Sequence, residues 1–194
     1  MKIGIIREGK IPPDARVPLT PKQCRKIEAN FPVDISVEPS ENRVFKDEEY
    51  VKQEVTLSKD MENCEVLMGV KEVPIDNLIP NKTYFFFSHT IKEQVYNREL
   101  LQAILAKNIR LIDYEVLTDE KSRRLIAFGR FAGMVGAHNG LWTYGKRTGI
   151  FELKRMKDYK DYAEAKAFYK AVQFPPIKIV LTGTGRVGKG AAEV

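Results

Sequence analysis

Two side chains that can change protonation near neutral pH follow two short apolar runs. Lys71 comes directly after residues 65–70, and His89 comes directly after residues 84–88. Both runs are apolar enough to be buried strands, and open α/β sheets place ligands at the ends of such strands. Histidine titrates near neutral pH, and burial can lower the pKa of a lysine. We expect Lys71 and His89 to share proton transfer, with a surface lysine and a hydrogen-bonded strand-end histidine as the alternatives.

Arg16 carries a permanent positive charge earlier in the chain. Arg16 follows a loop with paired prolines and comes shortly before a helix start. A guanidinium in such a loop can bind a carboxylate through two parallel hydrogen bonds. We interpret Arg16 as a carboxylate-binding residue, with an ordinary surface arginine as the alternative.

A glycine-rich loop follows the apolar run at residues 177–181, which we expect to be a strand. Its sequence is Gly183-Thr184-Gly185-Arg186-Val187-Gly188. Between a strand and a helix, Gly-x-Gly-x-x-Gly is typical of dinucleotide binding: it permits a tight turn, close approach to a pyrophosphate and close helix packing. An acidic ribose-binding residue usually follows about 20 positions later. Since six residues follow Gly188, we expect this sequence to contain only the start of such a unit.

The elements between these residues alternate between strand and helix. Thr20 and Pro21 resemble an N-cap and a first helical residue, which predicts a helix to about Asn30. We expect another helix over residues 92–107 and an extended segment over residues 123–128. Strands are expected at residues 2–6, 34–37, 65–70, 84–88 and 110–114. This alternation predicts an α/β domain.

Small residues dominate residues 129–144. Each glycine costs about 1 kcal/mol in a helix relative to alanine, so a helix here needs close packing against another backbone, such as at a bridge between domains. We expect His138, a single histidine in this helix, to be structural. A second amphipathic helix is predicted at residues 158–172, before Pro175 and Pro176.

Composition limits the class of protein. The net charge is +6, but acidic residues are interspersed with the basic ones, which indicates a solvated surface rather than nucleic-acid binding. Attraction of anionic substrates or cofactor phosphates is the alternative. No apolar run approaches the roughly 20 residues of a membrane span, and no apolar signal core begins the chain, so we expect a cytoplasmic protein. Cys24 and Cys64 are isolated, which favours reduced structural thiols, and no residue spacing suggests a metal site.

Several motifs together carry a family resemblance. They are Asp14-Ala15-Arg16-Val17-Pro18-Leu19-Thr20-Pro21, Gly69-Val70-Lys71-Glu72, Phe86-Phe87-Ser88-His89-Thr90-Ile91-Lys92, Leu111-Ile112-Asp113-Tyr114-Glu115, Arg124-Leu125-Ile126-Ala127-Phe128-Gly129 and Gly183-Thr184-Gly185-Arg186-Val187-Gly188-Lys189-Gly190. The chain resembles lysine-forming saccharopine dehydrogenases and the lysine-ketoglutarate reductase part of aminoadipic semialdehyde synthase. These lie within the alanine dehydrogenase/PNT N-terminal domain superfamily.

The resemblance implies a role for each site residue. Lys71 and His89 would be catalytic, and Arg16 and Arg124 would bind substrate carboxylates. The other implied substrate-binding residues are Glu72, Glu115 and Lys92, with Asp14 as a weaker candidate; the two glutamates would hold amino groups or tune the bases. NAD or NADP would be held by Gly183, Gly185, Arg186, Val187 and Gly188.

The resemblance also implies a domain plan and an activity. A Rossmann-like or flavodoxin-like parallel-sheet catalytic domain would cover residues 1–173, with linker helices from about 129, and a Rossmann domain would begin at residues 174–194. The whole enzyme would interconvert saccharopine with L-lysine and 2-oxoglutarate by imine formation and hydride transfer, while these 194 residues alone would be inactive. The implied partners are these small molecules, not nucleic acid or membrane. Whether the protein forms a homo-oligomer is left open.

Two rival functions remain at this point. An alanine dehydrogenase-like enzyme would need one arginine for a small oxo acid, whereas saccharopine has three carboxylates to bind. A non-catalytic regulatory homologue would keep the fold and lose turnover.

Overall fold

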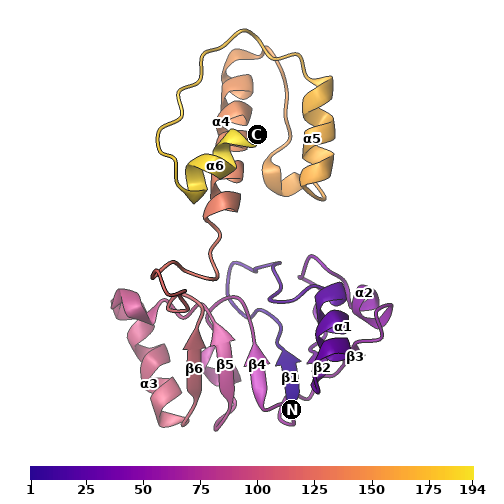
Figure 1. Cartoon of the computed structure of the whole chain (residues 1–194), viewed down its shortest axis with the longest axis vertical. Coiled ribbons are helices and arrows are strands. Elements are labelled where there is room, and N and C mark those ends of the chain that lie inside the picture. Colours follow the sequence, from indigo (N-terminus) through magenta and orange to yellow (C-terminus); the bar gives the residue numbers. More distant parts are fainter. The chain divides into compact units, whose positions relative to one another are not determined.

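Six parallel strands form one sheet in the first part of the computed structural model, which describes residues 1–194 (Figure 1). The sheet order is β3-β2-β1-β4-β5-β6, and every neighbouring pair is parallel. The strands are β1 (Lys2–Ile5), β2 (Asp34–Val37), β3 (Thr56–Leu57), β4 (Val66–Met68), β5 (Thr83–Phe86) and β6 (Arg110–Asp113). The predicted α/β class is therefore confirmed. The chain divides into two compact units, Met1–Ile126 and Ala127–Val194, which are described separately.

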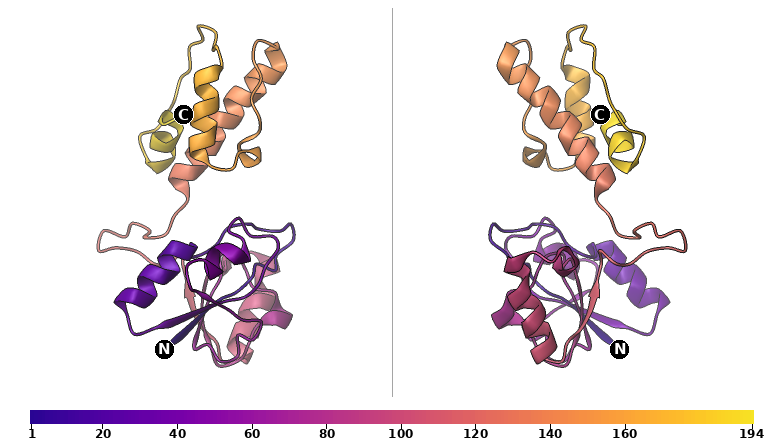
Figure 2. Two further views of the ribbon diagram at one scale, coloured as in Figure 1. Left: turned by 90° about the vertical axis from the view of Figure 1, so that its right-hand side faces the viewer. Right: turned by 90° about the vertical axis from the view of Figure 1, so that its left-hand side faces the viewer.

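Helices cover both faces of this sheet. Helix α1 (Pro21–Asn30) and helix α3 (Arg98–Ala106) lie on opposite faces (Figure 2), and α2 is a short helix at Asp47–Val51. One core cluster includes Ile5, Cys24, Ile35, Val37 and Tyr50, and a second includes Leu67, Tyr84, Phe86, Leu100 and Ile104. Two-sided burial explains why the middle of each longer strand is mostly apolar.

The start of α1 is as predicted. The Thr20 hydroxyl accepts the backbone N–H of Gln23, and the Gln23 side chain accepts the backbone N–H of Thr20, which forms a capping box. Pro21 occupies the first turn, where its missing N–H costs nothing.

Two predicted elements of the first unit differ in the structure. The helix expected over 92–107 begins only at Arg98, because Glu93 has a left-handed backbone (φ 53°) that a right-handed helix cannot continue. Residues 123–128 form no strand: after a turn at Ser122 (φ 56°), a single antiparallel bridge joins Arg124 to Thr118. Two short elements, α2 and β3, were not predicted.

The second unit consists of α4 (Gly129–Thr148), α5 (Tyr162–Ala171) and α6 (Arg186–Ala192). The predicted small-residue helix is confirmed, and the backbone that packs against it is that of α6. A Cβ added at Gly133 would lie 2.0 Å from the Val187 carbonyl oxygen, and one at Gly190 would lie 1.9 Å from the Arg130 carbonyl oxygen. Only glycine permits such close contact between the two helices.

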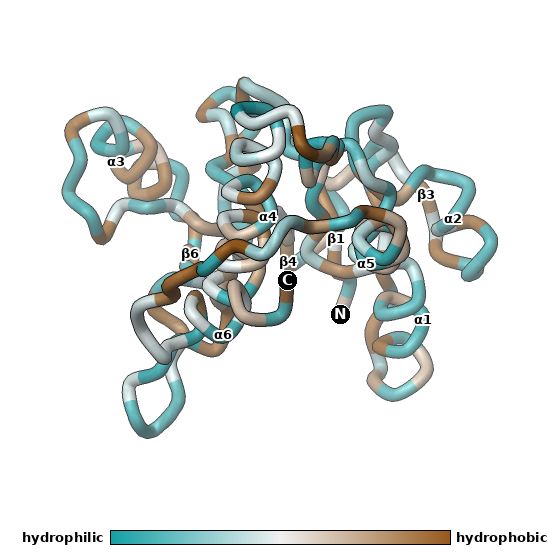
Figure 3. The backbone as a smooth tube through the Cα atoms, turned by 90° about the horizontal axis from the view of Figure 1, so that it is seen from above, coloured by the Kyte–Doolittle hydropathy of each residue, from teal (hydrophilic) through white to brown (hydrophobic).

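The strand predicted at residues 177–181 is wrong. The segment leading into α6 is strongly hydrophobic (Figure 3), and Ile179, Val180 and Leu181 are exposed. No strand of the structure pairs with it. A β-strand needs a neighbour that completes its hydrogen bonds, so apolar composition alone does not produce one here.

The packing of α4 against α6 gives a stability prediction. Gly133→Ala should destabilise the protein by about 1–3 kcal/mol, because the added methyl group meets backbone atoms that no rotamer change can move. Gly140→Ala is the matched control, since nothing lies within 4 Å of its added Cβ. It should be neutral or stabilise by up to about 1 kcal/mol through helix propensity. Urea unfolding measures both, and equal effects of the two substitutions would contradict the contact.

Candidate functional site

The parallel strands bring distant polar residues to one edge of the sheet. We call the edge at which the strands end the carboxyl edge. Lys71 and Glu72 follow β4, His89 and Lys92 follow its neighbour β5, and Glu115 follows β6. From β1 the chain adds β2 and β3 on one side, and it then adds β4, β5 and β6 on the other side. The switch point between β1 and β4 is where open α/β sheets bind ligands.

Glu8 joins the ends of β1 and β4. Its two carboxylate oxygens accept the backbone N–H groups of Val70 (2.7 Å) and Lys71 (2.9 Å). Burial raises the pKa of Glu8, although these two hydrogen bonds oppose the shift. Glu8 was not predicted as a site residue, and its position just after the first strand is the only signal in the sequence.

Glu72 connects His89 to a cation. One oxygen of Glu72 contacts His89 Nδ1, and the other accepts a hydrogen bond from Lys10 Nζ at 2.8 Å. Burial alone would raise the pKa of Glu72, but the hydrogen bonds from Lys10 and His89 outweigh it and lower the pKa below 4.5. Since an ionised carboxylate only accepts, Nδ1 carries a hydrogen, and Nε2 is left for proton exchange.

His89 itself has an unusual backbone. Its φ is 56°, in the left-handed region, and Asn97 Nδ2 donates to its carbonyl oxygen at 3.2 Å. The ring stacks on Phe87, with centroids 6.4 Å apart. Non-glycine residues adopt this conformation when the surroundings enforce it, often at functional sites.

Arg16 binds a carboxylate of its own chain. Its Nε lies 2.9 Å from Asp14 Oδ1, and a terminal nitrogen lies 2.5 Å from Asp14 Oδ2. The side-chain hydrogen bond from Arg16 lowers the pKa of Asp14, against the effect of burial. The Arg16 side chain is 43% exposed.

Glu115 is paired with the other two predicted substrate-binding cations. Its Oε1 lies 3.3 Å from Lys92 Nζ and 3.2 Å from an Arg124 terminal nitrogen. The Glu115 side chain is only 4% exposed, and its Oε2 is buried without a hydrogen-bond partner. One acceptor of this carboxylate is therefore unused within the chain.

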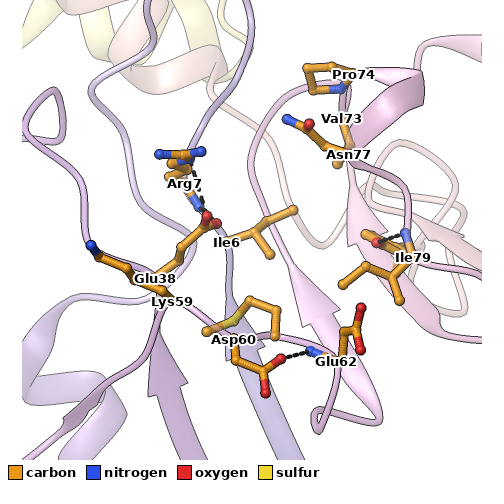
Figure 4. A pocket seen from close by; sticks show the side chains of 12 residues that line it. Ile6, Arg7, Glu38, Lys59, Asp60, Glu62, Val73, Pro74, Asn77 and Ile79 are labelled. Carbon is orange, nitrogen blue, oxygen red and sulfur yellow. Dashed lines mark hydrogen bonds and ion pairs between the residues drawn. The ribbon is translucent and has the colours of Figure 1, made fainter.

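Three cavities of the first unit lie near these groups. One of about 240 Å³ is lined by Lys10, Glu72 and Asn97, and another of about 510 Å³ is lined by Glu8 and Asp47. The third, of about 300 Å³, contains the ion pair of Arg7 with Glu38 (Figure 4). None of these three is lined by Lys71, His89, Arg16 or Arg124. That these four side chains share one cleft stays a prediction.

The glycine loop of the second unit meets the requirements of a phosphate-binding turn. Gly183 has a φ of 90°, which only glycine adopts readily, and a Cβ at Gly188 would lie 2.2 Å from the Gly183 carbonyl oxygen. Gly185 is the N-cap of α6, and Arg186 and Val187 form its first turn. The backbone of this loop therefore requires glycine at positions 183 and 188, and its binding of a dinucleotide stays a prediction.

The remaining candidates are structural. The ring nitrogens of His138 contact the Tyr169 hydroxyl (2.6 Å) and the Lys154 carbonyl oxygen (2.8 Å), so this buried histidine joins α4 to α5 as expected. Cys24 and Cys64 are free and buried, and burial raises the pKa of Cys24 to about 12. No group of three or more ligating side chains is placed to hold a metal, and no helix is long and apolar enough to cross a membrane.

The contacts of Glu72 predict an acid-dependent stability. A lowered folded-state pKa stabilises the protein above 4.5, and this stabilisation is lost as pH falls through the folded-state value. In Glu72→Gln the free energy of unfolding should therefore fall less on acidification than in the original protein. Urea unfolding at neutral pH and below 4.5 measures the effect, with Glu120→Gln as a control at an exposed position. The same acid dependence in Glu72→Gln and the original protein would contradict the pairing.

The sequence is similar to those of known proteins. Alpha-aminoadipic semialdehyde synthase, mitochondrial, from Bos taurus is 36% identical over 93% of the chain and 21% of its own length. Saccharopine dehydrogenase [NAD(+), L-lysine-forming] from Emericella nidulans is 30% identical over 100% of the chain and 56% of its own length. The chain thus spans about a fifth of the first relative and just over half of the second.

The fold also matches a solved structure. An L-alanine dehydrogenase aligns with a TM-score of 0.68 over 100% of this chain and 51% of that one, at 20% identity. At this identity the match shows the fold alone. The family model for the alanine dehydrogenase/PNT N-terminal domain matches residues 4–135, which include the whole carboxyl-edge network. The chain therefore belongs to the alanine dehydrogenase/PNT N-terminal domain family.

Proposed function

We propose that the chain supplies the substrate-handling part of an NAD(P)-dependent oxidoreductase that interconverts saccharopine with L-lysine and 2-oxoglutarate. The observation that carries this proposal is the contact of Glu72 with His89 beside Lys71, on adjacent strand ends. His89 and Lys71 can both move protons, and they lie at a sheet edge that also carries several cations. The relatives that are at least 30% identical are named for saccharopine or aminoadipic semialdehyde chemistry.

The chemistry requires several proton transfers. A secondary amine must lose a proton before its C–H bond is oxidised to an imine, and water must then add and the adduct collapse to amine and ketone. Nicotinamide, when bound, supplies the hydride acceptor. His89 Nε2 can take or return a proton while Glu72 holds the imidazole, and the Lys71 amine can carry the second proton.

The cations suit a substrate with several carboxylates. Arg16 and Arg124 already contact Asp14 and Glu115, and both arginine side chains are partly exposed. A substrate carboxylate can bind the same guanidinium groups. The buried Oε2 of Glu115 can accept a hydrogen bond from a substrate amino group, and Lys92 lies beside it.

The second unit suits the cofactor. Gly183, Gly185 and Gly188, with Arg186 and Val187, would hold the pyrophosphate of NAD or NADP. The support is the positive φ of Gly183 and its close approach to Gly188. A domain boundary at residue 173 and a cytoplasmic location stay predictions; the animal relatives are named as mitochondrial.

The choice between substrates is tested on the full-length protein that contains this sequence. Saccharopine should support reduction of NAD or NADP, whereas alanine should give little or no turnover, because an alanine site needs only one carboxylate clamp. Initial rates of nicotinamide absorbance with each substrate make the measurement. Faster turnover of alanine would assign an alanine dehydrogenase, and no turnover of either by a folded, cofactor-binding protein would favour a regulatory homologue.

Proton transfer and substrate binding should separate by mutation. Lys71→Met and His89→Gln should each lower kcat by about 10²- to 10⁴-fold and change the pH–rate profile. Arg16→Lys keeps its charge but loses the planar fork, so it should mainly raise KM and leave the profile in place.

Steady-state kinetics across pH measure these effects. Lys52→Met, at an exposed position after α2, is the control for loss of a lysine. A normal kcat and pH profile in His89→Gln would reduce His89 to a structural residue.

A further inference from the structure

A buried carboxylate connects the ends of β5 and β6. Asp113, the last residue of β6, is 6% exposed. Its Oδ2 accepts the backbone N–H of Ser88 at 3.2 Å and also contacts the Ser88 hydroxyl. Its Oδ1 accepts the backbone N–H of Glu115 at 2.7 Å. All three donors are neutral groups, and each belongs to a residue beside or within the candidate site.

Ser88 transmits this contact across His89. Its side chain is fully buried, and its hydroxyl oxygen accepts the Thr90 backbone N–H at 3.1 Å and lies 2.7 Å from the Thr90 hydroxyl. The residues on both sides of His89 are therefore joined to each other and to Asp113. His89, between them, has a left-handed backbone, which is uncommon for a non-glycine residue.

The same carboxylate fixes the next strand end. Its hydrogen bond to the Glu115 N–H sets the backbone from which the Glu115 side chain reaches Lys92 and Arg124. An asparagine would fit the space, but its NH₂ group would face one of the donors. The arrangement uses a group that only accepts, which an amide cannot replace.

We propose that Asp113 is a positioning residue that acts through Ser88 to hold the His89 ring against Glu72, and through its bond to the Glu115 N–H to hold the Glu115 carboxylate. Hydrogen bonds join Asp113 to Ser88 and to the backbone of Glu115. The kinetic consequence of this proposal rests on the proposed function, whereas the placement of the His89 ring does not.

The ring placement can be tested by NMR on the 194-residue chain, which contains only two histidines. Asp113→Asn should shift the His89 ring resonances and weaken the nuclear Overhauser contact between His89 and the stacked Phe87 ring. The signals of His138 should not move, because its contacts lie in the other unit. Unchanged His89 signals in Asp113→Asn would overturn the proposal.

Two further variants serve as an alternative and as a control for Asp113→Asn. Ser88→Ala removes only the hydroxyl and should shift His89 in the same direction by a smaller amount, so it serves if Asp113→Asn folds poorly. Asp34→Asn makes the same chemical change at an exposed position at the start of β2 and should leave His89 unchanged. An equal response to Asp34→Asn would show a general change of the sheet and contradict a specific link.

The kinetic arm uses the full-length protein with saccharopine. Asp113→Asn should lower kcat by about 10- to 100-fold, as expected when a reacting group is misplaced. Because one of its two branches acts through His89, Asp113→Asn combined with His89→Gln should lose less than the product of the two single losses. Fully multiplied losses would overturn the link through His89. If saccharopine gives no turnover in the original protein but the NMR response is present, the proposed function fails and the positioning role stands.

Discussion

Carboxylates that accept backbone N–H groups at the ends of parallel strands are the interaction on which the site depends. Where a strand ends, its last N–H groups lose their neighbours in the sheet and must find other acceptors. Glu38 accepts the N–H of Arg7 after β1, Glu8 accepts those of Val70 and Lys71 after β4, and Asp113 accepts that of Ser88 after β5. The polar side chains of the site therefore extend from a fixed backbone.

Other carboxylates of the carboxyl edge are paired with cations. Lys10, Arg16, Lys92 and Arg124 each pair with a carboxylate of the edge. The balance differs from one carboxylate to the next. Burial dominates at Glu8 and raises its pKa, whereas hydrogen bonds from Lys10 and His89 win at Glu72 and lower it. Neighbouring carboxylates of one network can thus differ in their affinity for protons.

The second unit solves a different packing problem. Its glycines at 133 and 190 remove the side chains that would separate α4 from α6, and the helices meet backbone to backbone. The contact with α4 fixes the position of α6. Gly183 and Gly188 close the turn that leads into it. The hydrophobic segment at residues 177–181 has no such partner and forms no strand.

Features that depend on residues close together in the chain could be predicted from the sequence alone. The capped start of α1, the apolar strands, the small-residue helix and the glycine loop could all be predicted, because each reflects local sterics, local hydrogen bonding or periodic burial. The family motifs also selected Lys71, His89, Arg16 and Arg124.

Only the tertiary structure decided which side chains pair. Glu8 is 63 residues from Lys71, and Asp113 is 25 from Ser88, so no spacing in the sequence predicts either contact. The left-handed backbone at Glu93, which shortens α3, and the unpaired segment at 177–181 were likewise not predictable from local pattern. The physical reason is that hydrogen-bond partners are set by strand order, and strand order is a property of the assembled sheet.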